Sequence, residues 1–589
     1  MAISNSISSR SGEETPLLLD YTVEGVVDYK GSPVLRSKSG GWRSAGLIIG
    51  VEITERFAYY GISSNLINFL TGPLGQSTAT AAENVNAWSG TSLLLPLLGA
   101  FVADSFLGRY RTIVVASVLY VLVSLFPFPF NYSLQTLGIG LLALSTLLPF
   151  YSPSLNQINK TTISTGPSQF QVVLFFFSLY LVAFAQGGHK PCVQAFGADQ
   201  FNGEDPEESK AKSSFFNWWY FGLNSGTVVT YFTVSYIQEN LSWALGFGVP
   251  CIAMIIGFIV FLAGTRTYRY TNIKQDEKSP FLRISTVFIT AIRNWRTDSS
   301  AIATEEESHG RLPQQSSVQF KFLNKALIVP NGSKEDGKTY CSVAEVEEAK
   351  AVLRLVPIWG TCLAYAIVFA QSSTFFTKQG ATMKRTIVPG FEIPAASLQS
   401  FLSLAIVLFV PIYDRFLVPV ARVFTRKPSG ITMLQRIGTG MVLSALSMVV
   451  SAVVETKRLK IAQEYDLVDR PSVTVPISVW WLLPQYVMFG IADVFTMVGL
   501  QEFFYDQVPN ELRSIGLALY LSIFGAGSFL SSFLVSAIDE VTGGSGQDSW
   551  FATNLNRGHL DYFYWLLAVL SAFGFGAYLY FARSYIYKV

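Results

Sequence analysis

The chain has 589 residues, half of them hydrophobic and 14% charged, and its net charge is +2. Soluble proteins carry about 25% charged residues, so this composition indicates a membrane protein, and the small net charge does not suggest a nucleic-acid partner. The four cysteines have no paired spacing and the three histidines are dispersed, which gives neither a disulfide framework nor a metal site. The sequence has no G-x-S-x-G motif or other catalytic constellation, so we expect neither enzyme activity nor a cofactor.

Residues 1–45 form a polar segment, which we predict to be a cytosolic N-terminal tail without a cleavable signal peptide. Glu13 followed by Leu17 and Leu18 has the spacing of an acidic dileucine sorting signal, which adaptor proteins read as an address. This interpretation predicts sorting adaptors as partners and the vacuolar membrane as the location, with the plasma membrane as the alternative. A plain exposed tail is the other interpretation of the same residues.

The first apolar run, near 46–70, is long enough to cross a bilayer, for which about 20 residues are needed. It contains Glu52, Glu55 and Arg56, and residues at this spacing share one face of a helix. Each ionisable group at membrane depth costs at least about 2.5–3.5 kcal/mol, and such groups usually face a water-filled cavity or one another. One Arg does not neutralise two carboxylates, so one carboxylate is free to titrate. We interpret the cluster as a proton relay; a structural ion pair between helices is the alternative.

The rest of the chain continues this pattern of apolar segments. Together with the first, the segments lie near 46–70, 87–107, 112–150, 170–189, 214–237, 241–264, 351–373, 396–414, 431–455, 476–502, 512–537 and 561–583. This layout predicts an all-α membrane protein with the twelve-helix major facilitator fold, made of two six-helix bundles. We place the bundles at 46–264 and 351–583, a cytosolic central loop at 265–350 and a C-terminal tail at 584–589. Apolar residues at helical spacing in 281–293 predict an amphipathic helix at the membrane surface.

Basic residues give the orientation of the spans. Lys and Arg concentrate after even-numbered spans, which places both termini and the central loop in the cytosol. The third segment is too long for one crossing, and a second crossing there would invert the basic loops that follow. We therefore interpret residues 123–136, which contain two prolines, as an insert that arises from alternative splicing or from the gene model.

Three motifs in this order resemble those of the proton-dependent oligopeptide transporters. They are E-x-x-E-R-F with Y-Y-G in residues 52–61, the stretch 99–113 between the second and third spans, and the stretch 216–226 in the fifth span. The resemblance covers nearly the whole chain from residue 42 onward. Residues 190–192 and 196–201 are similar to the plant nitrate/peptide branch, and the tail together with residues 490–493 resembles its fifth subfamily.

The resemblance assigns roles to individual residues. The proton-coupling residues that it implies are Glu52, Glu55, Arg56 and Lys190. The last of these would change its partner as the carrier turns over. The gating or structural motif after the second span comprises Asp104, Gly108 and Arg109. The tentative substrate contacts are Tyr59, Tyr60, Gln371, Gln485 and Asp493. Each tentative contact also fits ordinary packing inside a bundle.

The resemblance implies a proton-coupled secondary transporter of a small anionic or zwitterionic solute, such as nitrate, a small peptide or an amino-acid derivative. Two positions depart from family patterns: Ser63 stands where peptide carriers typically have Arg, and Phe369 stands where the dual-affinity nitrate carrier has His. The first departure weakens the assignment of a peptide substrate. The second weakens the assignment of the nitrate-binding mode that the dual-affinity carrier uses. The alternative function is a non-transporting sensor or receptor on the same scaffold.

Replacing Leu17 and Leu18 by Ala removes the dileucine pair. We expect a fluorescently tagged variant to move from the vacuolar membrane to the plasma membrane, because adaptors no longer recognise the tail. Microscopy of both proteins checks this, and an unchanged location of the variant contradicts it.

Deleting residues 123–136 should leave folding and transport intact, because the remaining apolar run still spans about 30 Å of hydrocarbon. Surface expression and uptake of the deletion variant measure this directly. A variant that does not reach the membrane would show that the segment is structural, and transcript sequencing tests the splicing origin separately.

Overall fold

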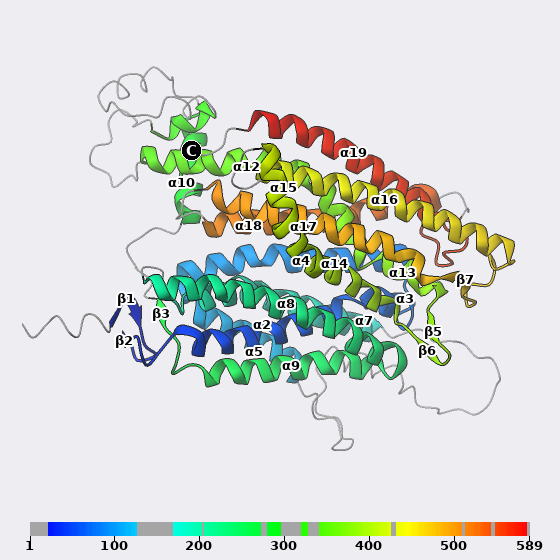
Figure 1. Ribbon diagram of the computed structural model, residues 1–589, viewed down its shortest axis with the longest axis horizontal. Coiled ribbons are helices and arrows are strands. Elements are labelled where there is room, and N and C mark those ends of the chain that lie inside the picture. The colour runs from blue at the N-terminus through cyan, green and yellow to red at the C-terminus, as the bar shows by residue number, and fades with distance from the viewer. Residues whose placement is uncertain are drawn as a thin grey trace, which may run out of the picture.

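The structure is a computed structural model that describes residues 22–125, 169–202, 205–271, 280–295, 320–327, 341–425, 431–508, 513–543 and 548–585. Long helices lie side by side and run the length of the molecule (Figure 1). The N-terminal bundle consists of α2 (Gly41–Ser63), α4 (Thr78–Val102), α5 (Arg109–Leu125), α7 (Gln169–Ala198), α8 (Pro206–Asn240) and α9 (Trp243–Ala263). The C-terminal bundle consists of α12 (Val343–Phe369), α14 (Gln399–Ile412), α16 (Met433–Glu464), α17 (Leu483–Asp506), α18 (Arg513–Gly543) and α19 (Leu560–Ser584).

Short elements mark the two ends of the molecule. The short helices are α3 (Leu66–Thr71), α10 (Pro280–Arg293), α13 (Phe375–Ala381) and α15 (Val418–Thr425). At one end β1 (Thr22–Val27) pairs antiparallel with β2 (Pro33–Leu35) and β3 (Tyr270–Thr271). At the other end β4 (Met383–Lys384) pairs parallel with β7 (Val475–Ser478), and β5 (Thr386–Val388) pairs antiparallel with β6 (Phe391–Glu392). We call these the proximal end and the distal end; they lie at the left and right of Figure 1.

Side-chain caps fix where several helices begin. Asp205 accepts hydrogen bonds from the first backbone N–H groups of α8, and Pro206 occupies the first helical position. Ser342 and Glu345 form a capping box at the start of α12, and Thr432 begins α16 in the same way. These caps are residues next to the helices that they begin, so the start of each helix follows from local sequence.

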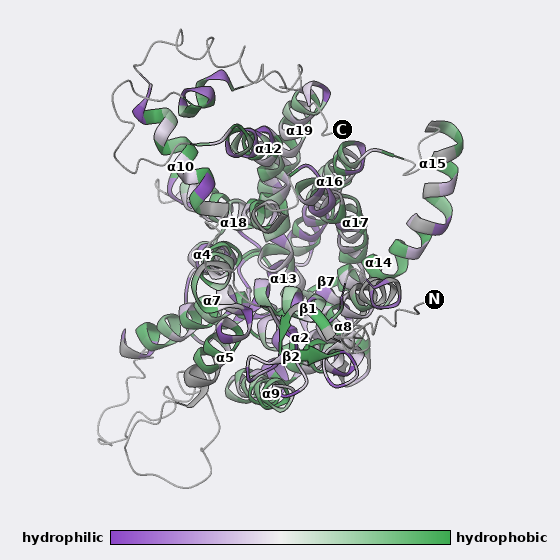
Figure 2. Ribbon diagram, turned by 90° about the vertical axis from the view of Figure 1, so that its left-hand side faces the viewer, coloured by the Kyte–Doolittle hydropathy of each residue, from purple (hydrophilic) through white to green (hydrophobic). Residues whose placement is uncertain are grey.

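The bundles pack internally, and their long helices meet along two pairs. In the N-terminal bundle α2 packs on α8 and α9, and α7 packs on α4 and α5; in the C-terminal bundle α16 packs on α17 and α19, and α12 packs on α18. The bundles contact each other through α4 against α18 and α8 against α14. Figure 2 shows these helices end-on, with α10 and α15 standing out from them. The boundaries that we placed at 45, 264, 350 and 583 remain predictions.

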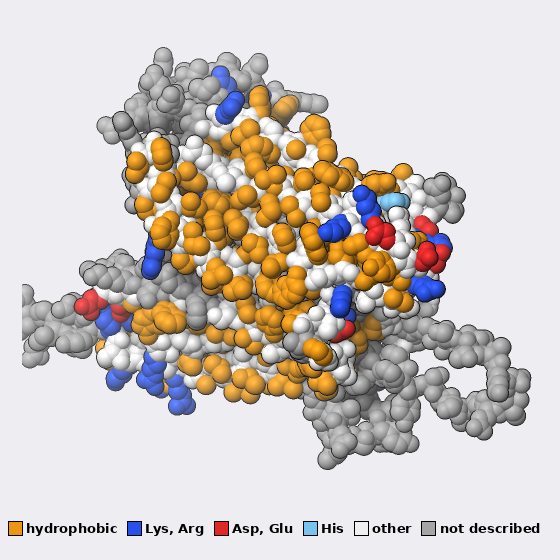
Figure 3. Space-filling model, turned by 45° about the vertical axis from the view of Figure 1, so that its right-hand side comes forward, with side chains coloured by type: hydrophobic (Ala, Val, Ile, Leu, Met, Phe, Trp, Pro, Cys, Tyr) orange, Lys and Arg blue, Asp and Glu red, His pale blue; other side chains and the backbone are white. Residues whose placement is uncertain are grey.

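The outer surface is apolar where a membrane would surround it. Among the described residues, nine helices are long and apolar enough to cross a bilayer. Figure 3 shows a broad band of hydrophobic side chains on one face, with charged side chains toward its ends. Each of the twelve predicted segments overlaps a described helix, but α2, α5 and α8 are not among the nine. The charged cluster lowers the hydropathy of α2, and the described part of α5 ends at Leu125, so most of the predicted insert lies outside the described residues.

Two π-helical turns occupy matching places in the bundles. Ala103–Leu107 continues α4 and Tyr413–Leu417 continues α14, and both have the pattern x-Asp-x-Phe-Leu. After the first turn, Gly108 has φ 77°, which glycine adopts without the strain that a Cβ atom would impose. Gly108 thereby lets the chain turn directly from α4 into α5.

The predicted amphipathic helix at 281–293 is present as α10. Val287 and Ala291 are buried against Leu323 and Val346, so one face packs on the chain that precedes and begins α12. Ile289 and Ile292 are exposed on the other face. Its location at the membrane surface remains a prediction.

Gly99→Ala should lower the thermal stability of the purified protein. A Cβ at this position would lie 2.0 Å from the backbone O of Gly187, so α4 and α7 would have to separate. The matched control is Gly360→Ala in α12, where a Cβ meets nothing within 4 Å. We expect the control to be neutral or stabilising by about 0.5–1 kcal/mol. Equal melting temperatures of the two variants would contradict this account of the α4–α7 contact.

Candidate functional site

Three charged side chains of α2 meet inside the N-terminal bundle. Arg56 Nε lies 2.8 Å from Glu52 Oε1 and 3.6 Å from Glu55 Oε2. Glu52 is 1% exposed and Glu55 is fully buried, whereas the Arg56 side chain is 11% exposed. The structure therefore brings together the three residues that helical spacing placed on one face, and Arg56 is shared by two carboxylates.

α7 supplies the second side of this cluster. Gln186 Nε2 donates a hydrogen bond of 2.9 Å to Glu55 Oε1. One helical turn later, Lys190 Nζ lies 5.0 Å from the ring centroid of Tyr59, which is a cation–π distance. Its charge acts on both Glu52 and Glu55, yet among the described residues it forms no salt bridge with either. Lys190 is thus close to two carboxylates and is held by an aromatic ring.

Sequence analysis missed two members of the cluster. It did not consider Gln186, and it considered His189 only as a metal ligand. His189 is fully buried and close enough to Glu55 for an electrostatic interaction. A signal was available, because Gln186 lies three and four positions before His189 and Lys190, and residues at these spacings are neighbours on a helix.

Aromatic side chains surround the cluster toward the second bundle. Tyr59 stacks on Trp88 of α4 with ring centroids 5.4 Å apart, and Tyr60 meets Tyr231 of α8 edge to face at 5.5 Å. Tyr60 is also close enough to Asp493 of α17 for an electrostatic interaction. Tyr60 and Asp493 therefore approach each other from opposite bundles.

Asp493 is the buried carboxylate of the C-terminal bundle. Tyr365 of α12 donates a hydrogen bond to Asp493 Oδ1, and the Tyr365 ring stacks on Phe489 with centroids 5.9 Å apart. Asp493 is 4% exposed, and no basic side chain within the described chain forms a salt bridge with it. Sequence analysis gave no indication of Tyr365, because its contact with Asp493 joins positions 128 residues apart.

The two predicted glutamine contacts lie in other networks. Gln371 Nε2 donates to the backbone O of Ile367 at 2.7 Å and to Ser531 Oγ at 3.0 Å, and Ser531 also accepts from Asn86 of the N-terminal bundle. Gln485 Nε2 donates to Gln379 Oε1 at 3.3 Å. The structure does not join either glutamine to the Arg56 cluster, and their contact with substrate remains a prediction.

The motif after α4 lies away from the cluster. Arg109 NH1 donates a 2.5 Å hydrogen bond to Asp199, which follows the C-terminal end of α7, and so ties α5 to α7. Gly108 provides the turn described above, and the side chain of Asp104 lies outside the described residues. Their gating role remains a prediction.

The two bundles are joined by hydrogen bonds toward the distal end. Lys378 Nζ donates to Thr71 Oγ1 at 2.8 Å, and Arg385 NH1 lies 2.8 Å from Glu239 Oε2. Gln399 Nε2 donates to the backbone O of Ser64 at 2.9 Å. These three contacts lie toward the distal end of the molecule. The two bundles are therefore closed against each other at the distal end.

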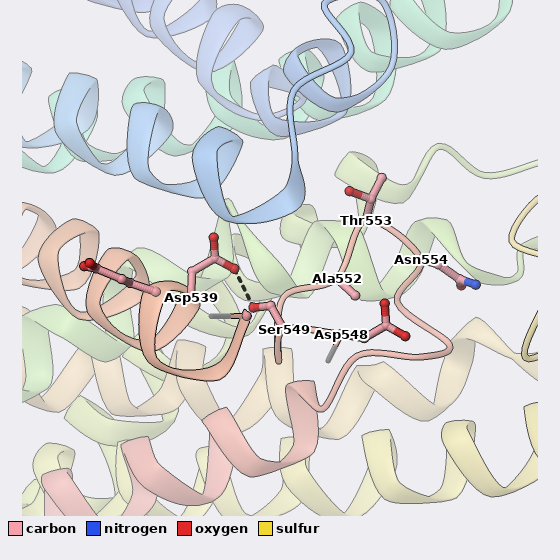
Figure 4. A pocket seen from close by; sticks show the side chains of 8 residues that line it. Asp539, Asp548, Ser549, Ala552, Thr553 and Asn554 are labelled. Atoms are coloured by element: carbon pink, nitrogen blue, oxygen red, sulfur yellow. Dashed lines mark hydrogen bonds between the residues drawn. The ribbon is translucent and has the colours of Figure 1, made fainter. Parts of the chain in front are cut away.

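A separate pocket of about 580 Å³ opens at the distal end, in the loop between α18 and α19 (Figure 4). Asp539, Asp548 and Asn554 line it, and Ser549 donates a hydrogen bond to Asp539. This acidic pocket does not include any residue of the Arg56 cluster.

Residues 130–551 match the POT family model. The chain belongs to the POT family. It is 62% identical to "Protein NRT1/ PTR FAMILY 5.10" of Arabidopsis thaliana and 56% identical to "Protein NRT1/ PTR FAMILY 5.13" of the same plant, over 99% and 98% of both chains. These relatives confirm the predicted plant branch and its fifth subfamily.

Solved structures of the POT family share the fold of this chain. An auto-inhibited POT family peptide transporter aligns with a TM-score of 0.66 at 20% identity, covering 93% of this chain and 98% of its own. The POT family transporter PepTSo aligns with a TM-score of 0.67 at 19% identity, covering 92% and 98%. The predicted major facilitator fold is confirmed, and membership of a transporter family makes the chain a multi-pass, proton-coupled membrane transporter.

Proposed function

We propose that this POT family member moves a small anionic or zwitterionic solute together with protons by alternating access. The observation that carries the proposal is the sharing of Arg56 by Glu52 and Glu55, next to Lys190 on a neighbouring helix. The proton is the coupling ion, and the mechanism needs no cofactor.

The cluster supports a proton-dependent exchange of partners. With both carboxylates ionised, Arg56 and Lys190 together balance Glu52 and Glu55. Protonation of Glu55 removes one negative charge, so the attraction of Lys190 to the cluster weakens, while Arg56 keeps its 2.8 Å contact with Glu52. Because Lys190 lies on α7 and the carboxylates lie on α2, this loss of attraction favours a change in how the helices pack.

The distal hydrogen bonds define the closed side of the transport cycle. In the structure the bundles are latched at the distal end by Lys378–Thr71 and Arg385–Glu239. Alternating access requires these bonds to break when the bundles rock about the central site. With the predicted orientation, the described state is closed on the side away from the cytosol.

Charges of both signs support the solute class. Lys190 and Arg56 offer positive charge from the N-terminal bundle, and Asp493 offers negative charge from the C-terminal bundle. A solute with an anionic group and, in the zwitterionic case, an amine would find a partner on each side. Ser63 is 5% exposed and bears no charge, so the site does not hold the additional Arg typical of peptide carriers.

We extend the proposal to the location of the protein. Glu13, Leu17 and Leu18 fit recognition by sorting adaptors and delivery to the vacuolar membrane, where the distal end would face the lumen. Transport there would couple the solute to the proton gradient of that membrane.

Glu55→Gln should abolish uptake driven by a pH gradient, because the amide mimics a permanently protonated carboxyl. Exchange of labelled for unlabelled solute should persist, since exchange does not require the proton to leave. Lys190→Ala should lose both driven uptake and its pH dependence. The measurement is solute uptake by oocytes as a function of external pH, for the wild type and the two variants at matched surface expression.

The matched control is Glu207→Gln, the same chemical change at an exposed site in the first turn of α8. It should keep the wild-type pH profile. A wild-type pH profile in Glu55→Gln as well would show that the cluster is structural packing, and absence of uptake by the wild type for every anionic or zwitterionic solute would favour the sensor alternative.

A further inference from the structure

A second buried ion pair lies in the C-terminal bundle and is not used by the proposed proton coupling. Glu455 and Arg458 of α16 are both fully buried, and two bonds of 2.8 and 2.6 Å join the guanidinium to the carboxylate. Such a bidentate pair in a protein interior demands further hydrogen bonds to its remaining donors and acceptors. The location of those bonds indicates what the pair holds in place.

Arg458 secures the loop that precedes α19. Its NH1 donates to Asn556 Oδ1 at 2.6 Å, and its NH2 also donates to the backbone O of Leu555 at 2.9 Å. The Asn556 amide in turn donates to the backbone O of Leu467, which follows α16. The guanidinium therefore fixes the distal ends of α16 and α19 relative to each other.

Glu455 secures α13 through Gln379. Gln379 Nε2 donates to Glu455 Oε2 at 2.7 Å, and Gln379 Oε1 accepts from Gln485 Nε2 at 3.3 Å and from Tyr564 Oη at 3.4 Å. Gln379 is fully buried. One side chain of α13 thus contacts residues on α16, α17 and α19.

α13 depends on these contacts for its direction. The helix of the seventh span is interrupted at Ala370–Ser372, where a 3₁₀ turn separates α12 from α13. A helix of seven residues after such a break is not stabilised by its own backbone bonds alone, so its side-chain contacts determine where it points. The position of Gln379 therefore sets the position of the whole of α13.

The residues just before Gln379 connect α13 to the other bundle, Lys378 directly and Thr377 through Gln399 of α14. Lys378 Nζ donates to Thr71 Oγ1, and Gln399 Nε2 donates both to Thr377 Oγ1 at 2.8 Å and to the backbone O of Ser64. α13 is consequently anchored to the C-terminal bundle through Gln379 and latched to the N-terminal bundle through its neighbours.

We propose that Gln379 is a positioning residue of the distal gate: the buried Glu455–Arg458 pair holds it, and it aims Lys378 at the N-terminal bundle and keeps Thr377 bonded to Gln399. The anchor stays intact while the latch opens and closes, so α13 moves with the C-terminal bundle. This inference rests on the proposed alternating access, and it assigns a function to an ion pair that proton coupling leaves unexplained.

The test compares opening of the distal gate in Gln379→Met and in the parent protein. Ser397, fully buried, donates to the backbone O of Tyr231 in the other bundle, so a cysteine at 397 reacts with a maleimide only when the gate opens. Both backgrounds carry Ser397→Cys, are purified as full-length protein in lipid nanodiscs, and are labelled at acidic and at neutral pH. Protein that keeps Ser397 is labelled in parallel, and its signal gives the background from the native cysteines.

We expect Gln379→Met to label about tenfold faster, the shift that follows the loss of one hydrogen bond to a charged group. The matched control is Ser451→Ala, which removes a buried hydroxyl of α16 that donates to Ser447 O of the same helix. It should label at the parent rate. If Gln379→Met does not fold, Gln379→Asn replaces it in the test. The shorter side chain withdraws the amide by about 1.5 Å, so we expect this variant to label faster than the parent as well.

The outcomes separate this inference from the function on which it rests. Labelling of the parent that responds to pH, with an unchanged rate in folded Gln379 variants, overturns the positioning role alone. Absence of labelling at residue 397 in every background and at both pH values overturns alternating access itself.

Discussion

The sharing of Arg56 between Glu52 and Glu55 constrains the rest of the N-terminal bundle. A charge in the interior of a membrane protein persists only where other groups balance it, and here the balance requires contributions from two helices. Gln186 satisfies one oxygen of Glu55, and the ring of Tyr59 holds Lys190 close to both carboxylates without pairing it with either. α2 and α7 therefore depend on each other, and a change of charge on either one alters the packing of both.

The C-terminal bundle balances its charges differently. Glu455 and Arg458 are neighbours on one helix and hold each other by two bonds, so no exchange of partners is needed and the pair acts as a fixed point. Asp493 is held by a tyrosine hydroxyl instead of a cation. One bundle thus contains a guanidinium shared by two carboxylates beside a lysine that is unbridged among the described residues, and the other contains a charge pair closed on itself. This asymmetry fits a transporter in which proton-dependent events and gate anchoring occur in different bundles.

Sequence was sufficient for features that depend on neighbours along the chain. The spacing of Glu52, Glu55 and Arg56 placed them on one face, apolar segments located the helices, and three ordered motifs identified the family. Contacts between segments far apart in the chain could not be predicted from the sequence. Examples are the bond between Tyr365 and Asp493 and the networks that hold Gln371 and Gln485. Glu455 and Arg458 lie among Lys457 and Lys460 near the end of a span, where the sequence resembles a solvated helix end; only the packing of α13, α17 and the loop before α19 buries them.

The absence of α2 from the nine strongly apolar helices has a consequence for biosynthesis. α2 is the first of the twelve long helices along the described chain, and its charged face disfavours release into lipid by the translocon. The partner that satisfies Glu55, Gln186, is synthesised 131 residues later. At about 5–20 residues per second, α2 waits on the order of ten seconds before α7 exists. The charged face of α2 therefore lacks its α7 partner until the chain has been synthesised as far as Gln186.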